Sequence, residues 1–215
     1  MSNEWPQPFS YVEFSRKEEH VVPYRTLSEF VPAEVPTETL FEQAIEGCSH
    51  SFGLSAAAVL QRLEEGDRRM HSTFRYGVAK GLSSYLASLG STFHEVYVYG
   101  SSIKEGANPA SDIDIIVVVE RRRDEIKHLL KRLDLSITAH YRRLLGLDPG
   151  PVSLLDVQVV DRKEQAERSG YGAVLEGLHT RPICLWRSNP ANLGAFRKEG
   201  PQRSLNTPSS TTVAT

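Results

Sequence analysis

The chain has 215 residues, enough for one domain or for one domain with a small extension. Hydrophobic residues make up 40% and charged residues 24%, as in ordinary globular proteins, and the formal net charge of −2 gives no overall attraction to nucleic acid or membranes. Because the longest apolar run, residues 115–119, is too short to cross a bilayer and the first residues carry scattered charges, we expect a cytoplasmic protein with no membrane partner.

The first 66 residues are interpreted as an N-terminal extension with short helices. Residues 1–36 hold five prolines and six aromatic residues without a sustained helical period, which predicts an extended arm or an irregular packing layer. A short helix is predicted from Thr39, because Thr39 and Glu42 have the spacing of a capping box. A second helix, with a serine as its N-cap, is predicted over residues 55–65.

Residues 67–187 combine helix and strand patterns in the order of an α/β (α+β) domain. Residues 188–215 are rich in Ser, Thr, Pro, Asn and Gly and are predicted to form a disordered tail. The predicted core elements are a helix over 67–88, a strand over 94–99, a strand opened by Asp112-Ile-Asp114 and ending at 119, a helix over 121–145, a strand over 152–160, a helix near 163–175 and a strand over 183–186.

The most informative motif lies in residues 99–119, where Gly100-Ser101 follows one apolar run and Asp112-Ile-Asp114 opens the next. Side chains two apart on a strand point to the same face, so Asp112 and Asp114 are expected to project together. Two adjacent carboxylates repel each other unless a cation lies between them, and hard divalent ions such as Mg²⁺ prefer oxygen ligands and phosphate chains. The Gly-Ser turn offers backbone N–H groups and a hydroxyl to such a phosphate chain. The motif therefore predicts a metal site that handles a nucleotide.

This arrangement resembles the DNA polymerase β-like nucleotidyltransferase superfamily, over about residues 70–187. The signature of that family is Gly-Ser, a spacer, Asp-apolar-Asp, and a third carboxylate on a later strand. Gly100-Ser101 and Asp112-Ile-Asp114 supply the first parts here, and Asp156 in the third strand is the candidate for the last. Asp161, at the end of the same strand, is the competing candidate. The resemblance implies a small mixed β-sheet flanked by helices, and transfer of a nucleoside monophosphate from a nucleoside triphosphate to an acceptor hydroxyl.

The resemblance also implies a role for each residue of the motif. Asp112, Asp114 and Asp156 would be the catalytic residues and the ligands of a two-ion Mg²⁺ site, with Mn²⁺ as the alternative ion. Asp156 would complete the shell of the second ion or accept a proton. The nucleotide-binding residues would be Gly100 and Ser101 at the β- and γ-phosphates, extended by Ser102 and Lys104. A solvated loop position is the alternative for Lys104.

The motif leaves the acceptor open, because family members modify RNA ends, proteins, aminoglycosides and small metabolites. One alternative function is an antitoxin-type protein of the same fold, which binds and nucleotidylates a small helical toxin partner. Another is an aminoglycoside-type nucleotidyltransferase, and a non-catalytic scaffold is the third. An aminoglycoside site needs an acidic pocket, to which five glutamates are candidates, unless they are solvent-facing helix residues: Glu38, Glu42, Glu46, Glu64 and Glu65.

Two further patterns are interpreted as structural. Cys48 and Cys184 lie far apart without the spacing of a metal site, so we expect two buried, reduced thiols. The predicted helix over 121–145 has eight basic residues against Asp124, Glu125 and Asp134. Such a face could bind RNA, but a solvated face with its own i, i+4 ion pairs is the favoured interpretation.

Overall fold

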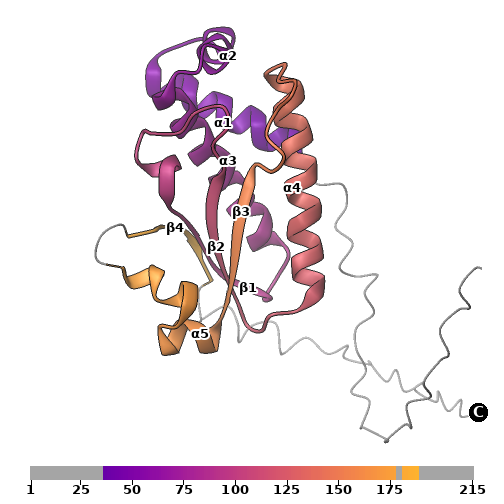
Figure 1. Cartoon of the computed structure of the whole chain (residues 1–215), viewed down its shortest axis with the longest axis vertical. Helices are drawn as coiled ribbons and strands as arrows, with labels where there is room; N and C mark the ends of the chain where they lie inside the picture. Colours follow the sequence, from indigo (N-terminus) through magenta and orange to yellow (C-terminus); the bar gives the residue numbers. More distant parts are fainter. Residues whose placement is uncertain (1–35, 178–180, 189–215) are drawn as a thin grey trace, which may run out of the picture. The chain divides into compact units, whose positions relative to one another are not determined.

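The computed structural model describes residues 36–177 and 181–188 (Figure 1). The predicted N-terminal arm, apart from Pro36, and the predicted tail, apart from Ser188, lie outside these residues. The described elements, including three 3₁₀ turns labelled η, are α1 (Thr37–Phe52), α2 (Ala56–Glu64), α3 (Arg68–Ser88), β1 (Phe93–Val98), η2 (Gly100–Ile103), β2 (Ile113–Val119), α4 (Asp124–Leu144), β3 (Leu155–Asp161), α5 (Arg162–Glu167), η3 (Gly170–Gly172), η4 (Val174–Glu176) and β4 (Ile183–Arg187).

The starts of the first three helices show which local signals decide. Ser55 caps α2 by accepting a hydrogen bond from the Ala58 N–H, as predicted. Asp67 caps α3 in the same way, accepting the N–H groups of the second and third helical residues. The capping box predicted at Thr39 is wrong, because α1 begins two residues earlier, directly after Pro36. A proline fixes φ near its helical value and lacks an N–H, so it is well suited to the start of a helix.

The four strands form one mixed sheet in the order β3-β2-β1-β4. Strand β1 pairs antiparallel with β2 and with β4, whereas β2 pairs parallel with β3. The α/β (α+β) fold class predicted from the sequence, a mixed sheet flanked by helices, is confirmed. The single helix predicted near 163–175 is wrong: α5 ends where Arg168 takes the left-handed conformation, at a φ of 53°, and two short 3₁₀ turns follow.

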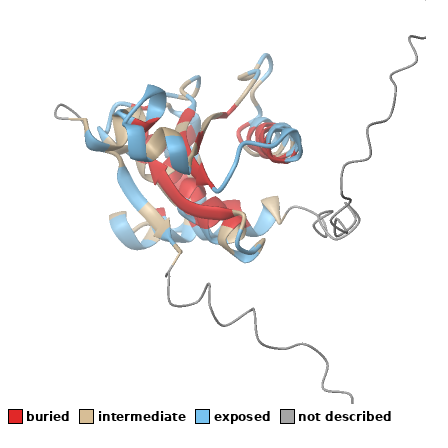
Figure 2. Cartoon of the chain, turned by 90° about the horizontal axis from the view of Figure 1, so that it is seen from below, coloured by how far each residue is buried: buried red, intermediate tan, exposed pale blue. Residues whose placement is uncertain are grey.

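The two faces of the sheet differ in the size of the hydrophobic cluster that packs against them. One face packs against α1, α3 and α4, and the alternate residues of β2 that point there, Ile113, Ile115, Val117 and Val119, are completely buried. The other face carries a smaller cluster around Tyr97 and Ile116, covered by residues of η4. Buried residues accordingly gather on the central strands and on the helix faces turned toward them (Figure 2). The second face is the one on which Asp114 lies, between Ile113 and Ile115 of the strand.

Helices α1 and α2, which the sequence placed in the N-terminal extension, pack onto the core through α3. Gly77 of α3 makes this contact close, because a Cβ at that position would lie 2.9 Å from the Cα of Ala44. The domain boundary proposed after residue 66 stays a prediction.

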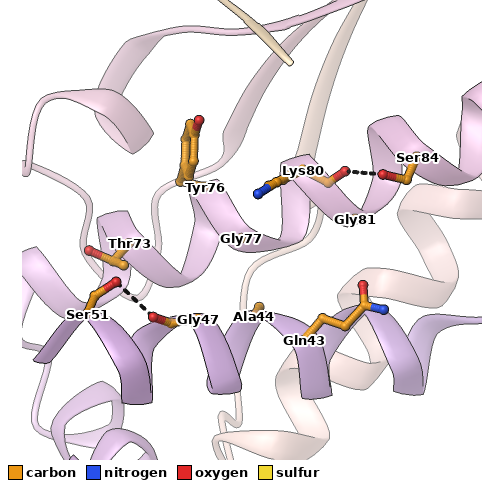
Figure 3. A pocket seen from close by; sticks show the side chains of 10 residues that line it. All are labelled: Gln43, Ala44, Gly47, Ser51, Thr73, Tyr76, Gly77, Lys80, Gly81 and Ser84. Carbon is orange, nitrogen blue, oxygen red and sulfur yellow. Dashed lines mark hydrogen bonds between the residues drawn. The ribbon is translucent and has the colours of Figure 1, made fainter. Parts of the chain in front are cut away.

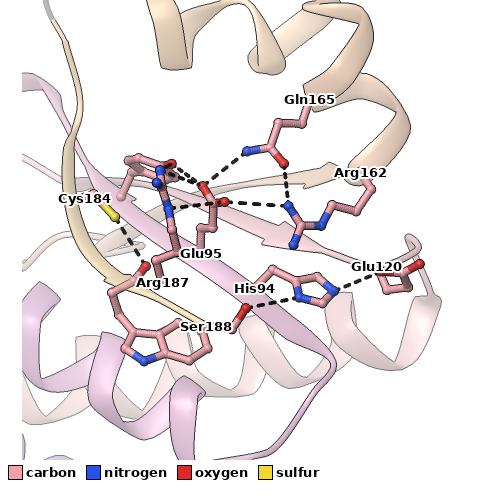
Figure 4. A network of polar contacts seen from close by, with 10 residues as sticks. His94, Glu95, Glu120, Arg162, Gln165, Cys184, Arg187 and Ser188 are labelled. Carbon is pink, nitrogen blue, oxygen red and sulfur yellow. Dashed lines mark hydrogen bonds and ion pairs between the residues drawn. The ribbon is translucent and has the colours of Figure 1, made fainter. Parts of the chain in front are cut away.

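A polar network holds the edge strand β4 and α5 to β1 (Figure 4). Glu95 is buried at its centre and accepts hydrogen bonds from Tyr97 and Gln165. Arg187 of β4 and Arg162 of α5 form ion pairs with the same carboxylate, at 3.4 and 3.6 Å. A buried carboxylate is tolerated when it is paired and hydrogen-bonded in this way, so the network ties three elements together.

The two cysteines differ in environment. Cys48 is completely buried in α1, and burial raises the pKa of its thiol to about 11, which makes it unreactive at neutral pH. Cys184 is exposed, so the prediction of two buried thiols is wrong for this residue. The reason is its position on β4, which is the edge strand of the sheet.

We predict that the chain loses stability below pH 6.5 through His71. This side chain is completely buried, its Nε2 donates to the Leu63 carbonyl at 2.8 Å, and its Nδ1 accepts from Arg75 at 2.9 Å. Burial, followed by the Arg75 charge, lowers the pKa of His71 to about 4. An unfolded histidine has a pKa of about 6.5, so between pH 6.5 and pH 4 the unfolded state binds more protons than the folded state. The free energy of unfolding therefore decreases as the pH is lowered, and at pH 5 it is about 2 kcal/mol below its value at neutral pH.

Urea unfolding of the wild type and of His71→Gln, at pH 7 and pH 5, measures this effect. Glutamine does not titrate, so the stability advantage of the wild type over the variant should shrink as the pH falls. An advantage that is equal at the two pH values would show that His71 is not held neutral in the fold.

Candidate active site

Three carboxylates meet at one end of the sheet. Asp112 directly precedes β2, Asp114 is the second residue of β2, and Asp156 is the second residue of β3. The parallel register pairs Asp114 with Asp156, which brings the two side chains next to each other on the same face. One carboxylate oxygen from each of the three residues lies within 4.8 Å of the other two. Asp112 is exposed and the other two are half-buried.

The electrostatics of this cluster are strained in the absence of a cation. Burial, followed by the charges of Asp112 and Asp156, raises the pKa of Asp114 to about 6, although the Ser101 N–H donates to it and lowers the value. Tyr99 lies beside the cluster, and its own pKa is raised by burial and then by the charges of Asp114 and Asp156. A divalent cation held among the three carboxylates would remove this repulsion, and an all-carboxylate donor set is the one that Mg²⁺ and Mn²⁺ prefer.

The Gly-Ser turn lies directly against the carboxylates. Gly100 has a φ of +70°, a conformation that side chains other than hydrogen rarely adopt, and a Cβ there would overlap the Asp114 carboxylate. Ser101 follows at the start of η2 and is half-buried. The turn therefore brings backbone without a side chain, at Gly100, and a hydroxyl, at Ser101, to the edge of the cluster, where a phosphate chain could approach.

The other two residues assigned to nucleotide binding are placed differently. The side chain of Ser102 is buried, and its Oγ has no hydrogen-bond partner among the residues that the structure describes. Lys104 is exposed at the end of η2. The structure thus joins Gly100 and Ser101 to the three carboxylates, encloses Ser102, and leaves Lys104 in solvent.

The sequence segment that contains this site matches a known protein family. The nucleotidyltransferase domain family matches residues 80–202, more than half of the chain, including the Gly-Ser turn and all three aspartates. The chain belongs to this family. No curated protein and no solved structure matches it significantly. Membership supports the general activity predicted above, transfer of a nucleoside monophosphate from a nucleotide substrate, in a family that usually uses divalent metal ions.

The nucleotidyltransferase domain places Asp161, the competing third carboxylate, away from the cluster. Asp161 lies at the far end of β3, opposite Val119, and its Oδ1 accepts a hydrogen bond from the Glu164 N–H at 2.8 Å as the N-cap of α5. Five residues of extended strand separate it from Asp156, or roughly 16 Å at 3.3 Å per residue. A capping role therefore accounts for Asp161.

We predict that Asp156→Asn lowers kcat about a hundredfold while leaving the KM for the nucleoside triphosphate within about threefold, because its proposed role is at the acceptor side. Asp161→Asn should leave both constants unchanged, since asparagine caps helices as well as aspartate does. Steady-state kinetics on the two variants measure the difference. The opposite pattern, with Asp161→Asn inactive and Asp156→Asn active, would identify Asp161 as the third carboxylate.

Two cavities of the domain are not lined by the carboxylate cluster. One of about 350 Å³ lies along the contact of α1 with α3 and is lined by small and polar side chains, with Lys80 as its one charged lining residue (Figure 3). A second, of about 220 Å³, lies beside η2 and includes Ser102 and Glu105. Neither is lined by any of the three aspartates, so the metal-binding assignment depends on the carboxylate cluster itself.

The structure also shows where the glutamates of the possible acidic pocket and the basic residues of α4 lie. The five glutamates considered for an acidic pocket are exposed on α1, on α2 and at the end of α2, and these helices cover the face of the sheet opposite to Asp114. The basic residues of α4 include solvated ion pairs, such as Lys127 with Asp124. Asp134 on the same helix is buried, in contrast to the solvated face favoured from the sequence. None of the helices within the described ranges is long and apolar enough to cross a membrane.

Proposed function

We propose that this chain is a Mg²⁺-dependent nucleotidyltransferase that transfers a nucleoside monophosphate from a nucleoside triphosphate to an acceptor hydroxyl. The observation that carries the proposal is the convergence of Asp112, Asp114 and Asp156 beside a Gly-Ser turn. Burial, followed by the charges of Asp112 and Asp156, raises the pKa of Asp114, and this fits a site that is completed by cations, with Mg²⁺ as the first choice and Mn²⁺ as the alternative.

Each residue of the site has its own role in the proposed reaction. Asp112, Asp114 and Asp156 would hold the metal ions, which supply neutralisation of phosphate charge and a lower pKa for the acceptor hydroxyl. The N–H groups of the turn at Gly100 and the hydroxyl of Ser101 hold the β- and γ-phosphates. The acceptor oxygen then bonds to the α-phosphorus, the bond to the β-phosphate oxygen breaks, and pyrophosphate leaves. Asp156, which is half-buried and pairs in register with Asp114, would receive the proton of the hydroxyl.

Label transfer tests this proposal. Each of the four nucleoside triphosphates, labelled at the α-phosphate, is incubated with Mg²⁺, the protein and an extract of the cells that express it, and products are sorted into RNA, protein and small molecules. We expect transfer of the α-label from at least one nucleotide and none with a chelator present. The matched control carries the label at the γ-phosphate, and there the protein should transfer no label to acceptors beyond what the extract transfers by itself.

Either of two results would contradict the proposal: transfer of the γ-label to an acceptor, which indicates a kinase, or no transfer of α-label from any nucleotide. The class of molecule that takes up the label also separates the alternatives for the acceptor. Label in a small helical protein would support the antitoxin-type function, and label in an added aminoglycoside would support the antibiotic-modifying one.

A further inference from the structure

Arg75 of α3 holds the loop that leads to Asp112. The side chain is completely buried. Its Nη2 donates to the carbonyl oxygens of Ser111 and Pro109 at 2.9 and 3.2 Å, and its Nε donates to Ser111 as well, at 3.2 Å. Tyr141 of α4 supports the same loop, because its hydroxyl lies 3.1 Å from Nη2 and donates to the Pro109 carbonyl at 3.3 Å. Ser111, the residue held twice, is the immediate neighbour of Asp112.

Asp134 of α4 holds the loop that leads to Asp156. Its side chain is 6% exposed, and its Oδ1 accepts the N–H groups of Leu154 and Leu155, each at 3.0 Å. Its Oδ2 accepts the hydroxyl of Ser153 at 2.9 Å. Burial raises the pKa of Asp134, but these hydrogen bonds outweigh it and the net shift is downward. Leu155 is the immediate neighbour of Asp156.

The two loops are also joined to each other, because the Ile113 N–H donates to the Leu154 carbonyl at 2.7 Å. Arg75 and Asp134 are thus two buried charges of opposite sign, on helices that cover the sheet face away from Asp114. Each forms hydrogen bonds with the backbone of the residue directly before a site carboxylate. The guanidinium of Arg75 has only donors and therefore binds carbonyl oxygens, whereas the carboxylate of Asp134 has only acceptors and therefore binds N–H groups.

Stability alone is a poor reason for these charges. Within residues 36–177 and 181–188, none of the ion pairs includes Arg75, and Asp134 has one, with the exposed side chain of Lys131 at 3.3 Å. Burial of a charge without an ionic partner is expensive, and buried charges can often be replaced by apolar side chains without loss of stability. What an apolar residue cannot do at these positions is orient two backbone groups of a loop by hydrogen bonds.

We propose that Arg75 and Asp134 are positioning residues, which fix the backbone ahead of Asp112 and Asp156 so that the three carboxylates meet closely enough to bind the same metal ions. The proposal rests on the proposed function in one respect, the binding of metal by the carboxylates. The holding of the two loops is independent of it.

Mn²⁺ binding, followed by electron paramagnetic resonance well below the melting temperature of each variant, tests the proposal. Arg75→Met and Asp134→Ala should each weaken Mn²⁺ binding tenfold or more, the range seen when groups that orient metal ligands are removed. Asp134→Asn keeps an oxygen that can accept from both N–H groups, so it should restore affinity to within about threefold of the wild type. Leu82→Ala, at a fully buried position seven residues further along α3 than Arg75, is the control for lost stability alone.

Amide hydrogen exchange in the same variants provides the second readout. Exchange should increase over residues 107–113 in Arg75→Met and over 153–156 in Asp134→Ala, with the other loop less affected. Wild-type affinity and exchange in Arg75→Met and Asp134→Ala, or an equal loss of affinity in Leu82→Ala, would overturn the proposal. If the wild type itself binds no Mn²⁺, the proposed function is wrong, and the exchange pattern alone then decides whether the two residues hold the loops.

Discussion

The Asp112→Ala/Asp114→Ala double variant is expected to transfer no detectable label from any nucleoside triphosphate. Asp112 directly precedes β2 and Asp114 is its second residue, and one carboxylate oxygen of each lies within 4.8 Å of the other and of an oxygen of Asp156. Their removal leaves one carboxylate, too few to hold an ion beside a triphosphate. Metal ions contribute several kcal/mol to stabilising the charge of such a transition state, and each 1.4 kcal/mol is tenfold in rate. The expected decrease in turnover is therefore about a thousandfold or more.

The fold should survive this double substitution. Asp112 is exposed, and Asp114 has a raised pKa, which shows that its charge is disfavoured where it lies. Thermal unfolding should give a melting temperature equal to that of the wild type or higher. The matched control is Asp124→Ala/Glu125→Ala, which removes two exposed carboxylates from the first turn of α4 and should transfer label normally. Full activity in the Asp112→Ala/Asp114→Ala variant would refute the site assignment.

The parts of the fold that follow from local periodicity were predicted from the sequence. Alternation along residues 112–119 is enough to place Asp112 and Asp114 on one face and Ile113 on the other, because a strand has a fixed period of two. The same rule places Asp156 on the face opposite to Leu155. Membership of the nucleotidyltransferase family agrees with the resemblance drawn from these motifs.

Features that depend on which segments meet in space were not predicted. Asp156 was preferred to Asp161 from the sequence, but the pairing of Asp156 with Asp114 depends on the register of β3 against β2, which no local pattern fixes. Asp134 reads as one more charge on a solvated helix until Leu154 and Leu155 are brought onto it. The early end of α5 also lacks a sequence signal, because the residue that takes the left-handed conformation there is an arginine rather than a glycine or asparagine.

The burial of Arg75 is a further feature that the sequence does not predict. Nothing in the sequence around it indicates that a basic residue in the middle of α3 is buried, and the residues it contacts lie between 4 and 66 positions away along the chain. Its partners in the loop, the carbonyl oxygens of Pro109 and Ser111, carry no side-chain signal in the sequence, because every residue has a backbone carbonyl.

Gly100→Ala is expected to lower turnover about a hundredfold and to destabilise the fold by about 1–2 kcal/mol. The φ of +70° accounts for about 1 kcal/mol of the loss, because a Cβ is disfavoured in the left-handed region. The larger consequence is steric: the added methyl group would overlap the Asp114 carboxylate and lie 2.8 Å from its Cγ. Asp114 must then move away from Asp112 and Asp156, and small misplacements of catalytic groups cost about a hundredfold in rate.

Gly53→Ala separates these two contributions. Gly53 has nearly the same conformation, a φ of +64°, but no atom lies within 4 Å of the position its Cβ would take. The control should therefore lose about 1 kcal/mol of stability and keep the activity of the wild type. Urea unfolding and label-transfer rates on both variants give the comparison. If Gly100→Ala behaves as Gly53→Ala does, with lower stability and full activity, then the close approach of the turn to Asp114 has no part in the reaction, and the glycine is there for its backbone conformation alone.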